Sequence, residues 1–149
     1  MTALIVIGGV AIGGWFRPLP DNKPLPASPA PIYTDQQVGE AKASVCAAFD
    51  KAHHALVVAG ARNFGEDQVA KQVVAEGGWE ALTTGSEYLL TTLAEEPATP
   101  PDLAQGIRKL AKLYQILALN FISDVSHSEQ DSVLRNSDEA TLTIERLCK

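Results

Sequence analysis

Apolar residues recur every three or four positions from residue 34 onward, which is the period of an amphipathic helix. Thr34 and Gln37 have the spacing of a capping box, and Asn63 and Gly65 mark a helix end. The pattern therefore predicts a first helix over 35–62. Its stripe is Val38, Ala41, Val45, Ala48, Ala52, Leu56 and Ala59.

A second helix is predicted over 66–95. Its inward positions are Val69, Val73, Leu82, Ser86, Leu89 and Leu93. The pair Gly77-Gly78 interrupts this stripe, and two adjacent glycines cost about 2 kcal/mol of helix propensity relative to alanine. We therefore expect a kink or local break there, with Trp79 packing just after it.

Two further helices follow a proline-rich loop at 97–101. Thr99 is the predicted N-cap of a third helix that ends near Asp124, with Pro100 in its first turn. Its stripe is Leu103, Ile107, Leu110, Tyr114, Leu117 and Phe121. A fourth helix is predicted to open at Ser128. Its inward positions are Val133, Ala140, Ile144 and Leu147.

The predicted fold is all-α. No segment shows strand periodicity, and no proline lies between residues 32 and 96 or after 101. Two helical hairpins joined by one loop should pack as an antiparallel up-down-up-down four-helix bundle over 34–149.

Residues 1–16 contain no charged side chain. The apolar run from Ala3 to Phe16 would measure about 21 Å as a helix, against roughly 30 Å of bilayer hydrocarbon. Two interpretations stay open: a transmembrane anchor whose upstream part lies outside this numbering, which we favour, or a signal peptide that lacks a basic start.

Two features of this segment fit a membrane anchor. Gly9 and Gly13 form a GxxxG motif, which lets helix backbones approach closely in lipid, although a chance match in a glycine-rich run stays open. Trp15, Phe16 and Arg17 are typical of an interfacial aromatic anchor followed by a snorkelling cation.

Residues 17–33 hold six of the nine prolines. Proline excludes helix and central strand, so this segment is expected to be an extended polyproline II linker. It would act as a stalk, or as a strand that docks along a neighbouring protein.

The net charge argues against two classes of binding partner, nucleic acids and anionic lipid surfaces. The chain carries a formal net charge of −6, and residues 34–149 carry −7. Nucleic-acid binding requires a basic surface, and docking on anionic lipid requires basic clusters. We therefore expect no nucleic-acid partner.

The chain has two cysteines, Cys46 and Cys148. A disulfide between them is geometrically feasible in the predicted bundle, and it would place the domain outside the cytoplasm. Two separate buried thiols stay open, and a zinc site lacks histidines at ligand spacing. Arg17 and Lys23 follow the apolar run and by the positive-inside rule favour the opposite orientation.

No constellation of side chains indicates catalysis, a metal or a cofactor. His53 and His54 are adjacent and point about 100° apart on a helix. Glu76, Glu80 and Glu87 fit a solvated acidic face better than an acid–base pair. We expect no enzyme, no metal site and no cofactor.

Several segments together resemble the alanine- and proline-rich single-pass membrane proteins of mycobacteria. These are the apolar run, the Ala/Pro-rich stalk, and residues 33–38 (YTDQQV), 45–49 (VCAAF), 85–89 (GSEYL) and 143–149 (TIERLCK). The resemblance spans nearly the whole chain. It implies a single-pass topology and a paired Cys46–Cys148, and it implies no activity.

The sequence thus favours a non-enzymatic, membrane-anchored accessory subunit of a cell-envelope complex, with residues 34–149 on the extracytoplasmic (periplasmic) side. One alternative is a disulfide-stabilised helical module that binds a ligand or inhibits an enzyme. Another is an all-helical enzyme of the chorismate-mutase kind, which needs Arg62, Arg108 and Arg135 inside the bundle. A small-molecule ligand is left open.

Overall fold

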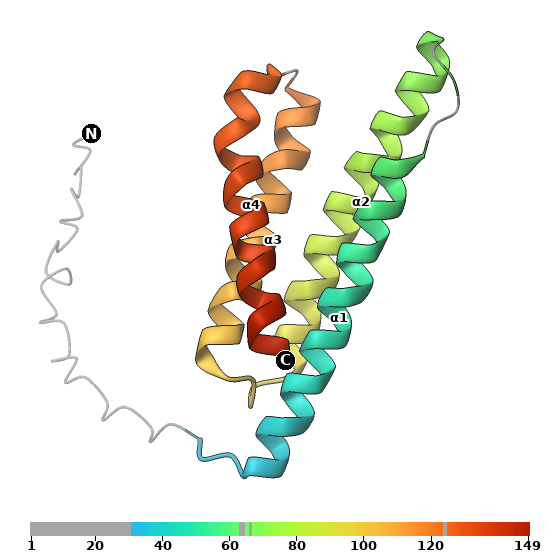
Figure 1. Ribbon diagram of the computed structural model, residues 1–149. Coiled ribbons are helices and arrows are strands. Elements are labelled where there is room, and N and C mark those ends of the chain that lie inside the picture. The colour runs from blue at the N-terminus through green and yellow to red at the C-terminus, as the bar shows by residue number, and fades with distance from the viewer. Residues whose placement is uncertain (1–30, 63–64, 66, 124) are drawn as a thin grey trace, which may run out of the picture. The chain divides into compact units, whose positions relative to one another are not determined.

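The fold is known from a computed structural model that describes residues 31–62, 65, 67–123 and 125–149. Residues 32–149 form one compact unit of four helices (Figure 1). No strand occurs in the part of the chain that the structure describes. The predicted all-α class is confirmed.

The helices are α1 (Asp35–Ala61), α2 (Gln68–Glu95), α3 (Pro101–Ile122) and α4 (His127–Cys148). Each packs along the next one in sequence, and consecutive helices run antiparallel (Figure 1). The interface between α1 and α4 is much smaller than the other three. The arrangement is therefore bundle-like, with α1 and α4 in contact over only a short stretch.

The start of α1 follows its sequence signal closely. The Gln37 amide donates to the Thr34 hydroxyl at 3.3 Å, and the Thr34 amide donates to the Gln37 side chain at 2.9 Å. This reciprocal capping box satisfies backbone donors that have no partner inside the helix. The predicted first helix is confirmed to within one residue at its end.

The caps of α3 and α4 differ from the prediction. Thr99 does not cap α3, because its amide and hydroxyl both donate to the Glu96 carbonyl and close the turn after α2. Pro100 is the N-cap instead. α4 opens at His127, one residue earlier than expected, and its N-cap is Ser126, whose amide and hydroxyl donate to the Glu129 carboxylate. These bonds lower the pKa of Glu129.

The expected break at Gly77-Gly78 is wrong, because α2 is helical throughout. Tertiary packing outweighs the glycine propensity here. Gly77, Ala81 and Gly85 recur every four residues on the side of α2 that lies on α1, and a Cβ on Gly85 would lie 3.7 Å from the Ala52 Cβ. Small residues at this spacing let the two helices pack closely.

The core lies toward the end of the bundle that holds the α2–α3 turn. Its largest side chains, each less than 2% exposed, come from all four helices: Val45, Phe49, Leu89, Leu103, Ile107, Leu110 and Ile144. At the opposite end, Val69 and Val73 are 71% and 45% exposed, and Phe121 is 46% exposed. The prediction that these three face inward is wrong, because the helices supply no partner surface there.

Candidate functional site

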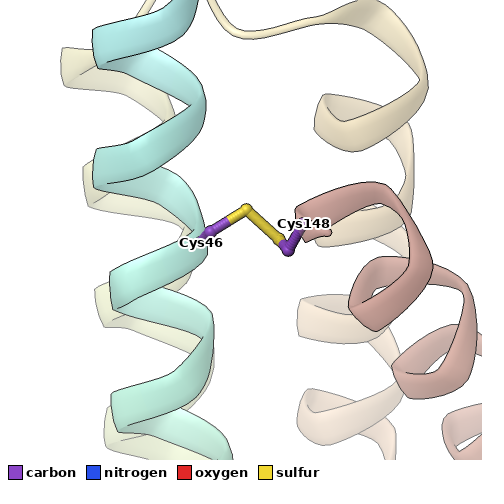
Figure 2. Close-up of a disulfide and its surroundings, with 2 residues drawn as sticks. All are labelled: Cys46 and Cys148. Carbon is purple, nitrogen blue, oxygen red and sulfur yellow. A yellow bond between two sulfur atoms is a disulfide. The ribbon is translucent and has the colours of Figure 1, made fainter.

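A disulfide joins the first and last helices. Cys46 of α1 and Cys148 at the end of α4 are bonded, with their Cα atoms 5.8 Å apart (Figure 2). Both side chains are partly buried against the hydrophobic core. The pairing predicted from the sequence is confirmed, and neither the separate-thiol nor the zinc alternative fits the bonded pair.

The predicted membrane residues lie outside the described residues. This applies to Gly9 and Gly13, and to Trp15, Phe16 and Arg17. Within the ranges that the structure describes, no helix is both long and apolar enough to span a membrane.

The candidate interaction site is an exposed surface over α2 and α3, which we call the Trp79 surface. Two adjoining grooves, of about 350 and 270 Å³, share Trp79 and Ile122. Trp79 is 40% exposed and Ile122 is 67% exposed, next to Leu119 at 61%. Apolar patches of this kind, rimmed by polar residues, mark interaction sites, and tryptophan is enriched among the residues that dominate binding.

Charges of opposite sign border this surface on its two helices. Glu76, Glu80 and Glu87 are exposed on α2, whereas Arg108 and Lys112 are exposed on α3. Among the described residues, no ion pair connects the two rows. Of these five residues only Glu76 lines the grooves. Glu87, Arg108 and Lys112 lie beyond the groove residues Thr83 and Gln115, toward the α2–α3 turn, so acidic side chains continue the surface along α2 and basic side chains continue it along α3.

A third groove, separate from the Trp79 surface, runs along the seam between α1 and α2. Its volume is about 490 Å³, within the range of small-molecule sites. Ala55, Ala59, Gly77 and Ala81 are among its small lining residues. At one end the Lys51 ammonium lies 5.5 Å from the centre of the Tyr88 ring, a cation–π contact.

The titratable residues singled out from the sequence do not converge. His53 stacks on Phe49 with ring centres 5.8 Å apart, and His54 is exposed. No group of three or more His, Cys, Asp or Glu side chains in the described ranges could hold a metal. Arg62, Arg108 and Arg135 are all exposed, so they do not form the interior cationic site that a chorismate-mutase mechanism requires.

One buried ionisable group lies in the core. Burial raises the pKa of the Tyr114 phenol to about 12, and the nearby Asp138 charge also raises it, while a hydrogen bond with Thr141 acts in the opposite direction. Tyr114 is only 2% exposed. It therefore stays neutral and links α3 to α4, which indicates a structural role.

The Trp79 surface was not predicted from the sequence. Trp79 was expected only to pack after a glycine break, and Phe121 was placed in the core stripe. One signal was available: Leu119, Phe121 and Ile122 lie on different sides of a helix, so a single inward stripe cannot bury all three. No family model, curated protein or solved structure matches the chain.

Proposed function

We propose that this protein is a non-enzymatic, membrane-anchored accessory subunit of a cell-envelope membrane complex. Residues 1–16 act as the anchor, with Gly9 and Gly13 packing against a partner helix and Trp15, Phe16 and Arg17 at the lipid interface. Residues 17–33 act as an extended linker. Residues 34–149 lie on the extracytoplasmic (periplasmic) side.

The Cys46–Cys148 disulfide carries this proposal. Disulfides persist in oxidising compartments and are rare in the cytosol of most organisms. A domain held outside the cytoplasm by an uncharged N-terminal segment acts next to the membrane. The exposed Trp79 surface supports a binding role, because a solvent-exposed tryptophan between two grooves is costly unless a partner covers it.

Affinity purification of the tagged full chain from native membranes tests the proposal. We expect an integral membrane protein to co-purify, and its yield to fall at least several-fold in a Gly9→Leu/Gly13→Leu double variant. Ala11→Leu is the matched control, because on a helix position 11 lies opposite both glycines and adds bulk away from their face. A chain that elutes alone from gently solubilised membranes contradicts the proposal.

Topology is tested separately. In intact cells, a membrane-impermeant thiol reagent applied after a mild impermeant reductant should label Cys46 and Cys148. Mass spectrometry of unreduced peptides should recover residues around 46 and 148 as one cross-linked species. Two free thiols, or labelling only after lysis, would place the domain in the cytoplasm and overturn the assignment.

The α1–α2 groove favours a second candidate function, that of a helical module that binds an apolar ligand. The small floor residues and the 490 Å³ volume support it. The full chain should bind 1-anilinonaphthalene-8-sulfonate saturably, and Thr84→Trp, which fills the groove, should weaken binding at least tenfold. Thr91→Trp, on the same helix outside the groove, is the control. Equal binding by both variants excludes this function.

A further inference from the structure

The Trp79 surface has two edges that differ in charge because of helix geometry. At 100° per residue, Glu76 and Glu87 lie on the same outer side of α2, next to the position of Thr83. Arg108 and Lys112 lie on the outer side of α3, next to the position of Gln115. Thr83 and Gln115 line the same groove. Glu87 and Lys112 therefore lie on the outer sides of α2 and α3, about one helical turn beyond this groove.

Glu87 and Lys112 also lie at matching positions along the axes of α2 and α3. Trp79 and Leu119 line one groove, so they lie at a common level. Because α2 and α3 are antiparallel, Glu87 lies about 12 Å from Trp79 and Lys112 about 10 Å from Leu119 in the same direction, at 1.5 Å per residue. Glu87 and Lys112 thus mark nearly the same height on opposite edges.

From this arrangement we propose that the Trp79 surface binds a second copy of the same chain. A two-fold axis parallel to the helices places α2 of each copy opposite α3 of the other. Glu87 of each copy then faces Lys112 of its mate, and Trp79 faces Leu119 and Ile122. Every contact occurs twice, as an isologous interface requires.

The alternative two-fold axis, across the helices, is disfavoured by charge. It would place α2 opposite α2 in antiparallel sense, so that Glu87 cannot lie directly opposite Lys112, and with the axis midway between positions 76 and 87 Glu76 would lie near Glu87 of the other copy. Like charges directly opposite each other suppress an association. The parallel dimer also points both N-termini the same way, which two chains anchored in one membrane require. This last point rests on the proposed function, whereas the charge argument does not.

Sedimentation velocity of the full chain in a density-matched non-ionic detergent tests the dimer. All chains carry Gly9→Leu and Gly13→Leu, so that association through the N-terminal segment does not contribute. We expect a dimer whose Kd rises about tenfold or more in Glu87→Lys and in Lys112→Glu. An equimolar mixture of these two variants should regain the dimer, because both cross-copy pairs become Lys–Glu.

Matched variants separate this effect from general charge and stability changes. Lys109 lines a groove on the α4 side of α3 with Thr143 and Leu147, and Glu139 lies on α4, so Lys109→Glu and Glu139→Lys should both leave the dimer intact. Ile122→Glu should abolish it, while Leu142→Glu, an exposed apolar residue on α4, should not. Circular dichroism verifies that each variant is folded.

Photo-crosslinking identifies the occupant in native membranes. A benzoylphenylalanine at position 119 should yield an adduct of two identical chains. A monomer throughout the micromolar range, a dimer indifferent to the charge reversals, a mixture that stays monomeric, or an adduct with another protein or lipid each overturns the proposal. The purification of a membrane partner tests the proposed function, and its result does not depend on whether the dimer forms.

Discussion

The two ends of the four-helix bundle are built from similar residues but differ in packing. At the end with the disulfide and the α2–α3 turn, the large apolar side chains are almost fully buried, as Ile107 and Ile144 show at 0% exposure. At the opposite end, Leu119 and Ile122 are more than 60% exposed. One end thus holds the fold together, and the other presents apolar surface.

The difference teaches that a helical stripe does not by itself determine burial. α3 carries one nearly continuous apolar stripe, yet its first four turns are enclosed by α2 and α4 while its last turn extends beyond the core. Burial depends both on the side of the helix on which a residue lies, as buried Ala118 and exposed Leu119 show, and on whether neighbouring helices reach its level. The packed end therefore supplies stability, and the exposed end is where a partner can gain the most by association.

Among the changes that test this difference between the two ends, removal of the disulfide should have the largest effect on the free energy of unfolding. The bond closes a loop with a sequence separation of 102 residues. In the chain-entropy model, its loss destabilises the fold by about 4 to 5 kcal/mol. We expect this loss in the free energy of unfolding for Cys46→Ala/Cys148→Ala, measured by urea denaturation. Reduced wild-type protein is the control, and equal stabilities of oxidised and reduced chains would contradict the prediction.

A matched pair of substitutions on α3 compares the two ends directly. Ile107→Ala should cost about 2 to 5 kcal/mol, because it leaves a cavity in a close-packed core. In the monomer, Ile122→Ala should change stability by less than about 0.5 kcal/mol, because the side chain is already exposed. Urea denaturation of both variants measures the difference. Similar losses at both sites would mean that the distal end is packed in solution.

Alkaline titration probes the packed region through Tyr114. Its folded pKa of about 12 exceeds the ordinary value of 10, so the neutral phenol is favoured by folding. Its contribution to stability is complete below pH 10 and is lost as the pH rises from 10 toward 12. Absorbance at 295 nm should show one of the three tyrosines ionising well after the others. Tyr114→Phe should remove that late step, and simultaneous titration of all three would contradict the burial.

The smallest expected difference in stability comes from alanine substitutions at two glycines, Gly78 and Gly106. Gly78 has open space where a Cβ would point, so Gly78→Ala should stabilise α2 by up to about 1 kcal/mol through helix propensity. At Gly106 of α3, a Cβ would lie 3.1 Å from Ile144 Cγ1, inside the packed end. Gly106→Ala should gain little or be destabilising, as measured by thermal unfolding. Equal gains at both positions would show that α3 and α4 are not tightly packed there.

The sequence predicted the helices well because their signals are local. The Thr34–Gln37 capping box and the proline-rich turn at 97–101 depend on neighbours in the chain, so their residues suffice to place them. The cysteine pair could be inferred because antiparallel topology constrains where a terminal helix can end. The continuity of α2 through Gly77-Gly78 could not be predicted from the sequence, since it depends on how closely α1 packs against α2.

The sequence signals apolar exposure near the end of α3, through Leu119, Phe121 and Ile122, but it does not place the Trp79 surface, for a related reason. Whether Phe121 or Val73 is buried depends on the relative lengths and splay of the two hairpins, and neither is encoded in the periodicity of one helix. The charges of Glu87 and Lys112 were visible, but their common level across two helices requires the register of α2 against α3. Tertiary geometry, more than composition, defines the candidate site.

The position of the disulfide also determines how the domain responds to mechanical force. Residues 46 to 148 form a covalently closed ring, so tension applied between the two chain ends passes through the sulfur bridge. Only residues 35–45 of α1 lie between that bridge and the N-terminal segment. Pulling on the ends can therefore unwind about three helical turns at most, while α2, α3 and nearly all of α4 remain unloaded.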